Sequence, residues 1–443
     1  MPYTEFYVTK GTGASNIFGG GPRLGENDAP VYFLPAGAGG ATVAEGTETQ
    51  ITDLSGGNWA ECLNEDWLCW DFEGVKELRR ITLIDGAVAT VHAACTVGVQ
   101  KPVAVGGAWK TVDFAASTIT TAFVNTPGYA PRVNVGLGTY AETVVVDNSG
   151  TGALPITFEG FEATAGDGCP SGTRPIINGA NVGASTWGSA KHYVNLKNID
   201  LNKTNNYHCC FINGGLYNQV INVRATNSGT GVCFYMSGRG RFVNCQAIGN
   251  TAADGFWLVS YDIGVLDCTA TGCKYGFNNN AAYAFFINCI AFGNDDDGFN
   301  FSGLGGLLLG CISRGNGGSG LRLNPATWSP AILNSIFTEN TVAGIECDIP
   351  YYGAVADYNA FYGNGAPRDD IDAGVHDVAL TADPFVNAAG GNFALNNAAG
   401  GGALCHSVGF PGTLIDGVNI GCSDIGALQH RSARRSRGRI HGV

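Results

Sequence analysis

Charged residues are scarce in this chain. They make up 14% of 443 residues, against about 25% in a typical soluble protein. Lys and Arg together number 24 and Asp and Glu 37, so the formal net charge is −13. Because nucleic-acid binding needs clustered cations to neutralise phosphates, this acidic body argues against nucleic acid as the main partner.

Long apolar runs are missing as well. No stretch reaches about 18 apolar residues, so we expect no membrane insertion. Residues 1–16 lack the basic start and apolar run of a secretory signal. We therefore expect most of the 15 cysteines to be free thiols in a chain that folds in a reducing cytosol. Because no cysteine pair has the spacing of zinc ligands, the sequence predicts neither a metal site nor a cofactor.

One nine-residue phrase, by contrast, occurs five times. FVNCQAIGN (242–250) is followed by VLDCTATGC (265–273), FINCIAFGN (286–294), LLGCISRGN (308–316) and ILNSIFTEN (332–340). The central residue falls at positions 245, 268, 289, 311 and 335, in steps of 23, 21, 22 and 24 residues. Repeats of this length indicate a solenoid or a propeller.

Two further markers share this period. One is a Gly that precedes an apolar residue, and the other is an Asn at a turn. The turn residues are Asn227, Asn250, Asn294, Asn316 and Asn340. We expect these Asn residues to adopt left-handed backbone and to hydrogen-bond to one another along the repeat.

Within each phrase apolar and polar residues alternate, which is typical of a strand with one buried face. Val243, Cys245 and Ala247 form the apolar set of the first phrase. Short strands broken by Gly and Asn predict an all-β parallel β-helix of about 22 residues per coil, with coils stacked about 4.8 Å apart. Cysteine would serve there as a small interior hydrophobe, in a core file of Cys245, Cys268, Cys289 and Cys311.

Segments on both sides of the repeat resemble known β-helix proteins. GTYAE (138–142) and TVDFAASTITTAFVN (111–125) resemble the opening coil and the N-terminal plug of the pectin-lyase-like superfamily. TADPFVNAAGGNFALN (381–396) and CSDIGALQH (422–430) resemble the closing segment of bacterial right-handed β-helix repeat proteins. The resemblance implies a right-handed parallel β-helix with an N-terminal plug over residues 111–380, followed by a closing segment over residues 381–430.

The two ends of the chain differ from this body. Residues 1–110 contain strand-like runs and a cluster of tryptophans, and they predict a small β-rich attachment domain. Residues 431–443 hold five arginines and predict a flexible basic tail. The tail is the segment suited to an acidic partner, whether protein, nucleic acid or an anionic surface.

Catalytic motifs of the superfamily are hard to find. Polygalacturonase-like enzymes carry a Gly-His-Gly phrase, which this chain lacks. NDDDGFN (294–300), with Lys274 about one coil below, would suit a Ca²⁺-dependent lyase, but adjacent Asp residues in a Gly-flanked turn are more often solvated. The catalytic residues thus stay unknown and the sequence leans away from an enzyme, with Ca²⁺ expected only under the lyase alternative.

Two outward files stand out instead. One has an aromatic ring, amides, an Arg and two acids, the composition of a glycan-contacting surface: Trp257, Asn278, Asn300, Arg322, Glu346 and Asp348. The alternative is a solvated face with one stray Trp. The other file is an apolar stripe, which indicates an interface with a covering loop or with partners in a trimer: Ile248, Ile290, Phe292, Ile312 and Ile336.

Together these features resemble phage tailspike and fibre proteins. Our hypothesis is a homotrimeric, virion-associated structural or receptor-binding protein, made in the host cytoplasm. It would attach to other virion proteins through residues 1–110 and bind a cell-surface polysaccharide. One alternative is a polysaccharide lyase or glycoside hydrolase of the pectin-lyase-like superfamily, and another is a bacterial adhesin at the cell surface.

Overall fold

The computed structural model divides the chain into two compact units, 1–228 and 229–443. The structure describes the strands within 3–105 and then residues 111–121, 130–179, 183–203, 205–227, 229–249, 251–325, 329–348, 353–413, 419–422 and 424–427. Asn250, Trp59 and the basic tail 431–443 lie outside these residues.

The first unit begins with an antiparallel sheet of eight strands, in the order β2-β9-β5-β6-β7-β4-β3-β8. Its strands are β2 (Tyr32–Leu34), β3 (Ala41–Val43), β4 (Gln50–Asp53), β5 (Trp67–Phe72), β6 (Val75–Asp85), β7 (Val88–Val91), β8 (Val99–Lys101) and β9 (Val103–Val105). Strand β1 (Tyr3–Val8) is not part of this sheet. It pairs in parallel with β10 (Ala130–Val135), so the start of the region 1–110 belongs to the coil that follows.

Parallel coils make up the rest of this unit. Each strand pairs with the third strand after it, which is the pairing of a solenoid with three strands per coil. The strands are β10, β11 (Thr139–Tyr140), β12 (Val144–Val146), β13 (Ile156–Gly160), β14 (Ile176–Asn178), β15 (Trp187–Ser189), β16 (Val194–Lys197), β17 (Asp200–Lys203), β18 (Cys210–Asn213), β19 (Asn218–Ile221) and β20 (Arg224–Asn227).

Helix α1 (Val112–Thr118) packs against β12, within the segment for which the sequence analysis predicts a plug. Its first turn is held by one carboxylate. The amide N–H groups of Val112 and Asp113 donate to Glu142 at 3.0 and 3.1 Å. No helix in the described residues is long and apolar enough to cross a membrane.

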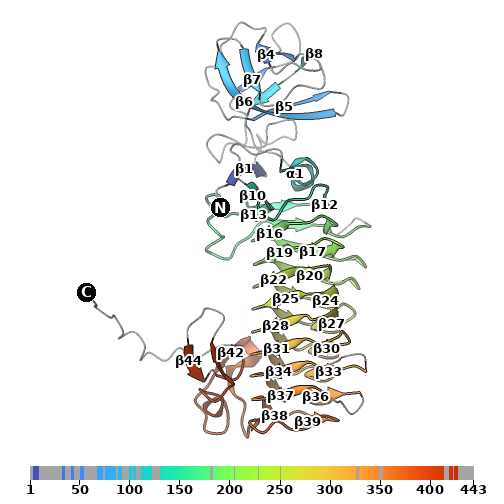
Figure 1. Ribbon diagram of the computed structural model, residues 1–443, viewed down its shortest axis with the longest axis vertical. Helices are drawn as coiled ribbons and strands as arrows, with labels where there is room; N and C mark the ends of the chain where they lie inside the picture. Colours follow the sequence, from blue (N-terminus) through green and yellow to red (C-terminus); the bar gives the residue numbers. More distant parts are fainter. Residues whose placement is uncertain are drawn as a thin grey trace, which may run out of the picture. The chain divides into compact units, whose positions relative to one another are not determined.

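The second unit repeats the three-strand coil, and its strands form three parallel sheets (Figure 1). Sheet one contains β22 (Gly240–Val243), β25 (Ile263–Leu266), β28 (Phe285–Ile287), β31 (Leu307–Leu309), β34 (Ala331–Leu333) and β37 (Val355–Asp357). Sheet two contains β23 (Gln246–Ile248), β26 (Thr269–Thr271), β29 (Ile290–Phe292), β32 (Ile312–Arg314), β35 (Ile336–Thr338), β38 (Ala360–Tyr362) and β40 (Val378–Ala379). Sheet three contains β21 (Phe234–Ser237), β24 (Phe256–Tyr261), β27 (Phe277–Ala282), β30 (Phe299–Phe301), β33 (Leu321–Leu323), β36 (Ala343–Cys347) and β39 (Ala366–Asp369).

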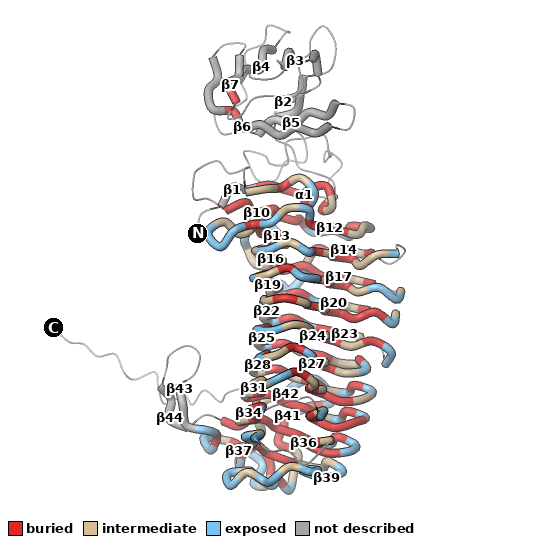
Figure 2. Tube along the Cα trace, turned by 45° about the vertical axis from the view of Figure 1, so that its right-hand side comes forward, coloured by how far each residue is buried: buried red, intermediate tan, exposed pale blue. Residues whose placement is uncertain are grey.

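The predicted fold class is therefore confirmed. The chain is an all-β parallel β-solenoid with about 23 residues per turn. Buried and exposed residues alternate along the strands of each coil (Figure 2). Phenylalanines fill the interior of sheet three, where the ring centroids of Phe256, Phe277 and Phe299 stack 4.8 Å apart.

The repeated phrase is not one continuous strand. It contains a corner between sheets one and two, where Asn244 has a left-handed backbone with φ of 52°. This residue shifts the alternation, so Phe242 is fully buried and Val243 only half-buried, whereas Cys245 and Ala247 face inward as predicted. The prediction that Val243 faces inward with Cys245 and Ala247 is thus wrong, because before the corner the inward residue is Phe242.

The four core cysteines lie in successive coils. All are buried free thiols, and the amide N–H of Cys245 donates to the Cys268 sulfur at 3.3 Å. Burial, with a hydrogen bond to the neighbouring cysteine, raises the pKa of the Cys268 and Cys289 thiols well above the ordinary value. They are packing residues rather than nucleophiles.

A second corner, between sheets two and three, carries a file of stacked asparagines. The side-chain amide of Asn294 donates to Asn316 at 2.9 Å, Asn316 to Asn340 at 2.8 Å, and Asn340 to Asn364 at 2.9 Å. Asn227, in the first unit, donates to the carbonyl of Tyr207. The left-handed residues here precede the asparagines, at Gly293, Gly315 and Glu339, so the expectation of left-handed Asn is wrong.

The repeated glycines pack against these amides. A Cβ at Gly298 would lie 2.8 Å from the Asn316 amide nitrogen and 2.1 Å from the Ser313 hydroxyl. A Cβ at Gly320 would meet Asn340 in the same way, at 2.8 Å. Glycine is therefore required at these two positions, where the chain passes over the Asn file.

Asn316→Ala tests this interlocked corner. The change leaves the backbone and side-chain N–H groups of Asn294 without their acceptor, so we expect a loss of roughly 2–5 kcal/mol in the free energy of unfolding. Urea denaturation measures it. The matched control is Asn280→Ala at an exposed position, expected to cost less than about 0.5 kcal/mol. Equal losses for the two variants would contradict this account of the corner.

Candidate functional site

The predicted glycan-contacting residues form one in-register file on the outer side of sheet three. Trp257 is paired with Asn278, Asn278 with Asn300, Asn300 with Arg322, and Arg322 with Glu346. All of these, and Asp348, are half-buried, whereas their strand neighbours Phe256, Phe277 and Leu321 are fully buried. We call this set the sheet-three face: Trp257, Asn278, Asn300, Arg322, Glu346 and Asp348.

Hydrogen bonds run from coil to coil along this face. The Asn278 amide donates to Asp254 at 2.8 Å, and the Asn300 amide donates to Asn278 at 3.3 Å. Arg322 donates to Asp348 from Nε at 3.0 Å, and its Nη2 lies 2.9 Å from Asp348 and 3.9 Å from Glu346. These contacts fix the side chains in place, so the face presents a preformed polar surface.

One end of the face is aromatic. The ring of Trp257 lies 5.4 Å from the ring of Tyr235 in an edge-on arrangement. The Trp257 indole N–H has no hydrogen-bond partner among the described residues. Because this nitrogen is buried, the half-exposed ring offers a sugar its flat apolar surface rather than its N–H.

The Asp-rich turn before β30 is less exposed to solvent than the sequence predicts. Asp295 is exposed and Asp296 half-buried, but Asp297 is only 1% exposed. Its Oδ1 accepts the amide N–H of Ser319 at 2.8 Å, and Oδ2 has no partner among the described residues. Burial, reinforced by Asp296 and Glu346 and opposed by the Ser319 amide and by Arg322, raises the pKa of Asp297 to about 7.

Other ionisable groups surround this carboxyl. Burial raises the pKa of Asp254, and burial together with Asp296 raises the pKa of Tyr275 to about 12. Glu346 accepts a hydrogen bond from the Ser319 hydroxyl at 2.6 Å. The cluster thus combines a carboxyl that holds its proton near neutral pH with carboxylates that are paired to donors.

A glycine in the next coil makes room for the acids. A Cβ at Gly318 would lie 2.4 Å from Asp297 Oδ1 and 2.7 Å from Asp296 Oδ1. The sequence pattern pointed to the Asp run only under the lyase alternative and gave no indication of Asp254, Tyr275 or Ser319 as site residues. The available signal was an Asp run directly before a repeat glycine, with Gly317-Gly318 at the equivalent turn one coil later.

No metal centre is visible at these carboxylates. Within the described ranges, no group of three or more His, Cys, Asp or Glu side chains is arranged to hold a metal ion. The Asp run therefore gives no geometric support to the Ca²⁺ site of the lyase alternative.

The apolar stripe on sheet two is largely covered by the chain itself. Ile312 and Ile336 are buried in a cluster with Phe385, Phe393 and Ile425, and Ile290 and Phe292 pack against it. Strands β41 (Phe385–Asn387) and β42 (Asn392–Leu395) belong to this covering segment, whereas Ile248 is half-buried. Of the two alternatives for the stripe, the structure shows the covering loop, so most of it is not available to trimer partners.

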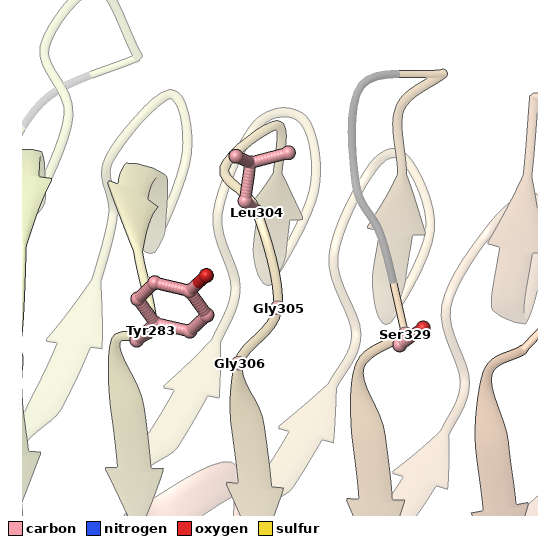
Figure 3. A pocket seen from close by; sticks show the side chains of 5 residues that line it. All are labelled: Tyr283, Leu304, Gly305, Gly306 and Ser329. Carbon is pink, nitrogen blue, oxygen red and sulfur yellow. The ribbon is translucent and has the colours of Figure 1, made fainter.

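A shallow hollow of about 620 Å³ lies at the corner between sheets three and one. Its lining residues come from successive coils: Tyr283, Leu304, Gly305, Gly306 and Ser329 (Figure 3). It has few polar groups, and none of the sheet-three face lines it. We therefore regard the face, not the hollow, as the candidate site.

Solved structures similar to this chain include two lyases and a phage tailspike protein. A pectate lyase, Pel9A, is 15% identical over 73% of this chain and 92% of its own, with a TM-score of 0.48. An alginate lyase from Paenibacillus sp. str. FPU-7 is 10% identical over 59% of this chain and 98% of its own, with a TM-score of 0.40. The tailspike protein gp49 of Pseudomonas phage LKA1 is 14% identical over 79% of this chain and 65% of its own, with a TM-score of 0.28.

The structural neighbours are thus pectate lyase and related parallel β-helix proteins, as the sequence resemblance implies. No protein-family model matches the chain, and a search of curated proteins finds no match either. At TM-scores below 0.5 and at most 15% identity, these likenesses carry no argument about what this chain binds or does.

Asp297→Asn tests the environment of the buried carboxyl. Because the folded pKa of about 7 exceeds the unfolded value of about 3.9, the folded wild type binds the extra proton between these values and loses stability as the pH rises through them. The Asn variant lacks this loss. We expect it to match the wild type near pH 4 and to be more stable by roughly 3 kcal/mol at pH 8.

Denaturation curves of both proteins at the two pH values measure this difference. A stability difference that does not change with pH would show that Asp297 titrates normally.

Proposed function

We propose that the sheet-three face binds an extended polysaccharide that runs along the stacking axis of the coils. The observation that carries this proposal is the in-register file of Trp257, Asn278, Asn300 and Arg322. Coils repeat about every 4.8 Å, so a chain laid across the strands meets one side chain per coil.

The chemistry of the file supports a sugar ligand. The Trp257 ring offers a stacking surface, and the amides of Asn278 and Asn300 offer both donors and acceptors to hydroxyl groups. The side chains are already held by hydrogen bonds to Asp254 and to each other, so little conformational entropy is lost on binding.

Trp257→Ala should lower glycan affinity by roughly tenfold or more, because removal of an aromatic anchor typically costs more than 1–2 kcal/mol. Binding of the best ligand from a glycan array, measured by calorimetry, provides the test. Tyr283→Ala is the matched control, since that ring is exposed but lies at the hollow rather than on the face. If affinity survives in the first variant and falls in the second, the proposal is wrong.

Hydrolysis of the bound glycan is the second candidate, and Asp297 is the observation that favours it. Its protonated carboxyl would give a proton to the glycosidic oxygen as the bond to the anomeric carbon breaks. Water would attack that carbon and pass its proton to Glu346, the carboxylate beside Arg322. The products are two shorter chains, one with a new reducing end.

Release of reducing ends from the bound polysaccharide tests hydrolysis. Asp297→Asn should lower the rate at least 100-fold, and the wild-type rate should fall above pH 7 as the acid loses its proton. No reducing ends from any bound glycan would leave binding alone as the function.

The remaining expectations stay predictions. They are the homotrimer, the virion location, and attachment to other virion proteins through residues 1–110. The adhesin and the lyase also remain alternatives to the virion protein.

A further inference from the structure

We propose that the sheet-three face selects a polysaccharide without carboxylates, and that free amino groups on its sugars raise the affinity. This inference rests on the proposed function, because it names the class of glycan bound at the same face. It excludes the polyuronates, the substrates named for the pectate and alginate lyases among the structural neighbours.

The first support is an excess of negative charge. Six carboxyl groups belong to the face or adjoin it in the described part of the second unit, and the pKa values of two of them, Asp254 and Asp297, are raised; the other four are Asp296, Glu346, Asp348 and Asp369. Two cations accompany them, Lys274 and Arg322. A bound uronate would add like charges to a surface whose acids already outnumber its bases.

The two cations are also already engaged. Arg322 makes two contacts of 2.9 and 3.0 Å to Asp348, and its Nη2 lies 3.9 Å from Glu346. The Lys274 ammonium lies 4.8 Å from the centre of the Tyr275 ring and interacts with Asp254. A uronate would have to displace these partners, whereas a hydroxyl or an ammonium group would not.

The second, independent support is the buried Asp297. Its Oδ2 is buried and has no partner among the described residues, in a structure that satisfies most of its buried polar atoms. Gly318 leaves Asp297 and Asp296 on the same side of the turn, with both Oδ1 atoms close to the place of the missing Cβ. Above the pKa of about 7 this oxygen carries no proton, and an ammonium or hydroxyl donor from a sugar would then satisfy it whereas a carboxylate would not.

The expected discrimination is large enough to measure. Two like charges a few ångströms apart repel each other even in bulk water, and more strongly near a protein surface. A repeating uronate meets several acids along the face. We therefore expect its affinity to be at least tenfold lower than that of a comparable glycan without carboxylates, with the gap narrowing at high salt.

The experiment is an array of neutral, amino-bearing and uronate-bearing oligosaccharides of similar length, incubated with the full-length wild-type protein at low salt. We expect the tightest ligands to carry no carboxylate, with glucosamine oligomers above their N-acetylated counterparts. A uronate oligomer among the tightest ligands overturns the inference and leaves the proposed function standing. Binding to no glycan overturns both.

A pair of variants supplies a second readout. Asp296→Asn combined with Glu346→Gln should raise the affinity for uronate oligomers relative to glucosamine oligomers by roughly tenfold, since two like charges are removed. Asp262→Asn is the control, because that exposed carboxylate pairs with Arg239 away from the face. An equal shift in both variants, or none in the double variant, would count against the inference.

Discussion

The structure of the second unit depends on a close contact between repeated glycines and a file of stacked asparagines. From Asn294 to Asn364 each Asn amide bonds to the next along the axis, and Gly276, Gly298 and Gly320 pass over an amide at a distance that leaves no space for a Cβ. The contact permits one register between neighbouring coils. In the coils that share this contact, it helps to hold the register that brings the outward side chains of sheet three into a straight file.

The same corner explains why a buried carboxyl with a raised pKa, that of Asp297, is found beside the face. Asp297 comes directly before Gly298, the residue that must lie against Asn316. The backbone is therefore drawn inward at this point, and the Asp side chain is buried with it under Gly318 of the next coil. The raised pKa of Asp297 thus follows from a packing requirement of the fold. This requirement places the carboxyl next to the polar side chains of the sheet-three face.

Much of the fold and of the candidate site could be predicted from the sequence, because each coil repeats the same pattern of Cys, Gly and Asn residues. One period is shared by the Cys phrase, the Gly marker and the Asn marker. This period was sufficient to predict the coil and to place the residues from Trp257 to Asp348 in one outward file. The left-handed corner at Asn244 was not predictable from alternation alone, since one residue with positive φ shifts the pattern without changing composition. The burial of Asp297 could not be predicted because it depends on Gly318, which lies one coil away. The covering of Ile312 and Ile336 could not be predicted because the segment that covers them does not belong to the repeat.

The most direct test of the account is a crystal structure of the protein with its tightest-binding oligosaccharide. The account predicts sugar rings over Trp257, Asn278, Asn300 and Arg322, with the glycan crossing the strands of sheet three one coil at a time. A ligand seated in the hollow beside Tyr283, or on sheet one or sheet two, would contradict it.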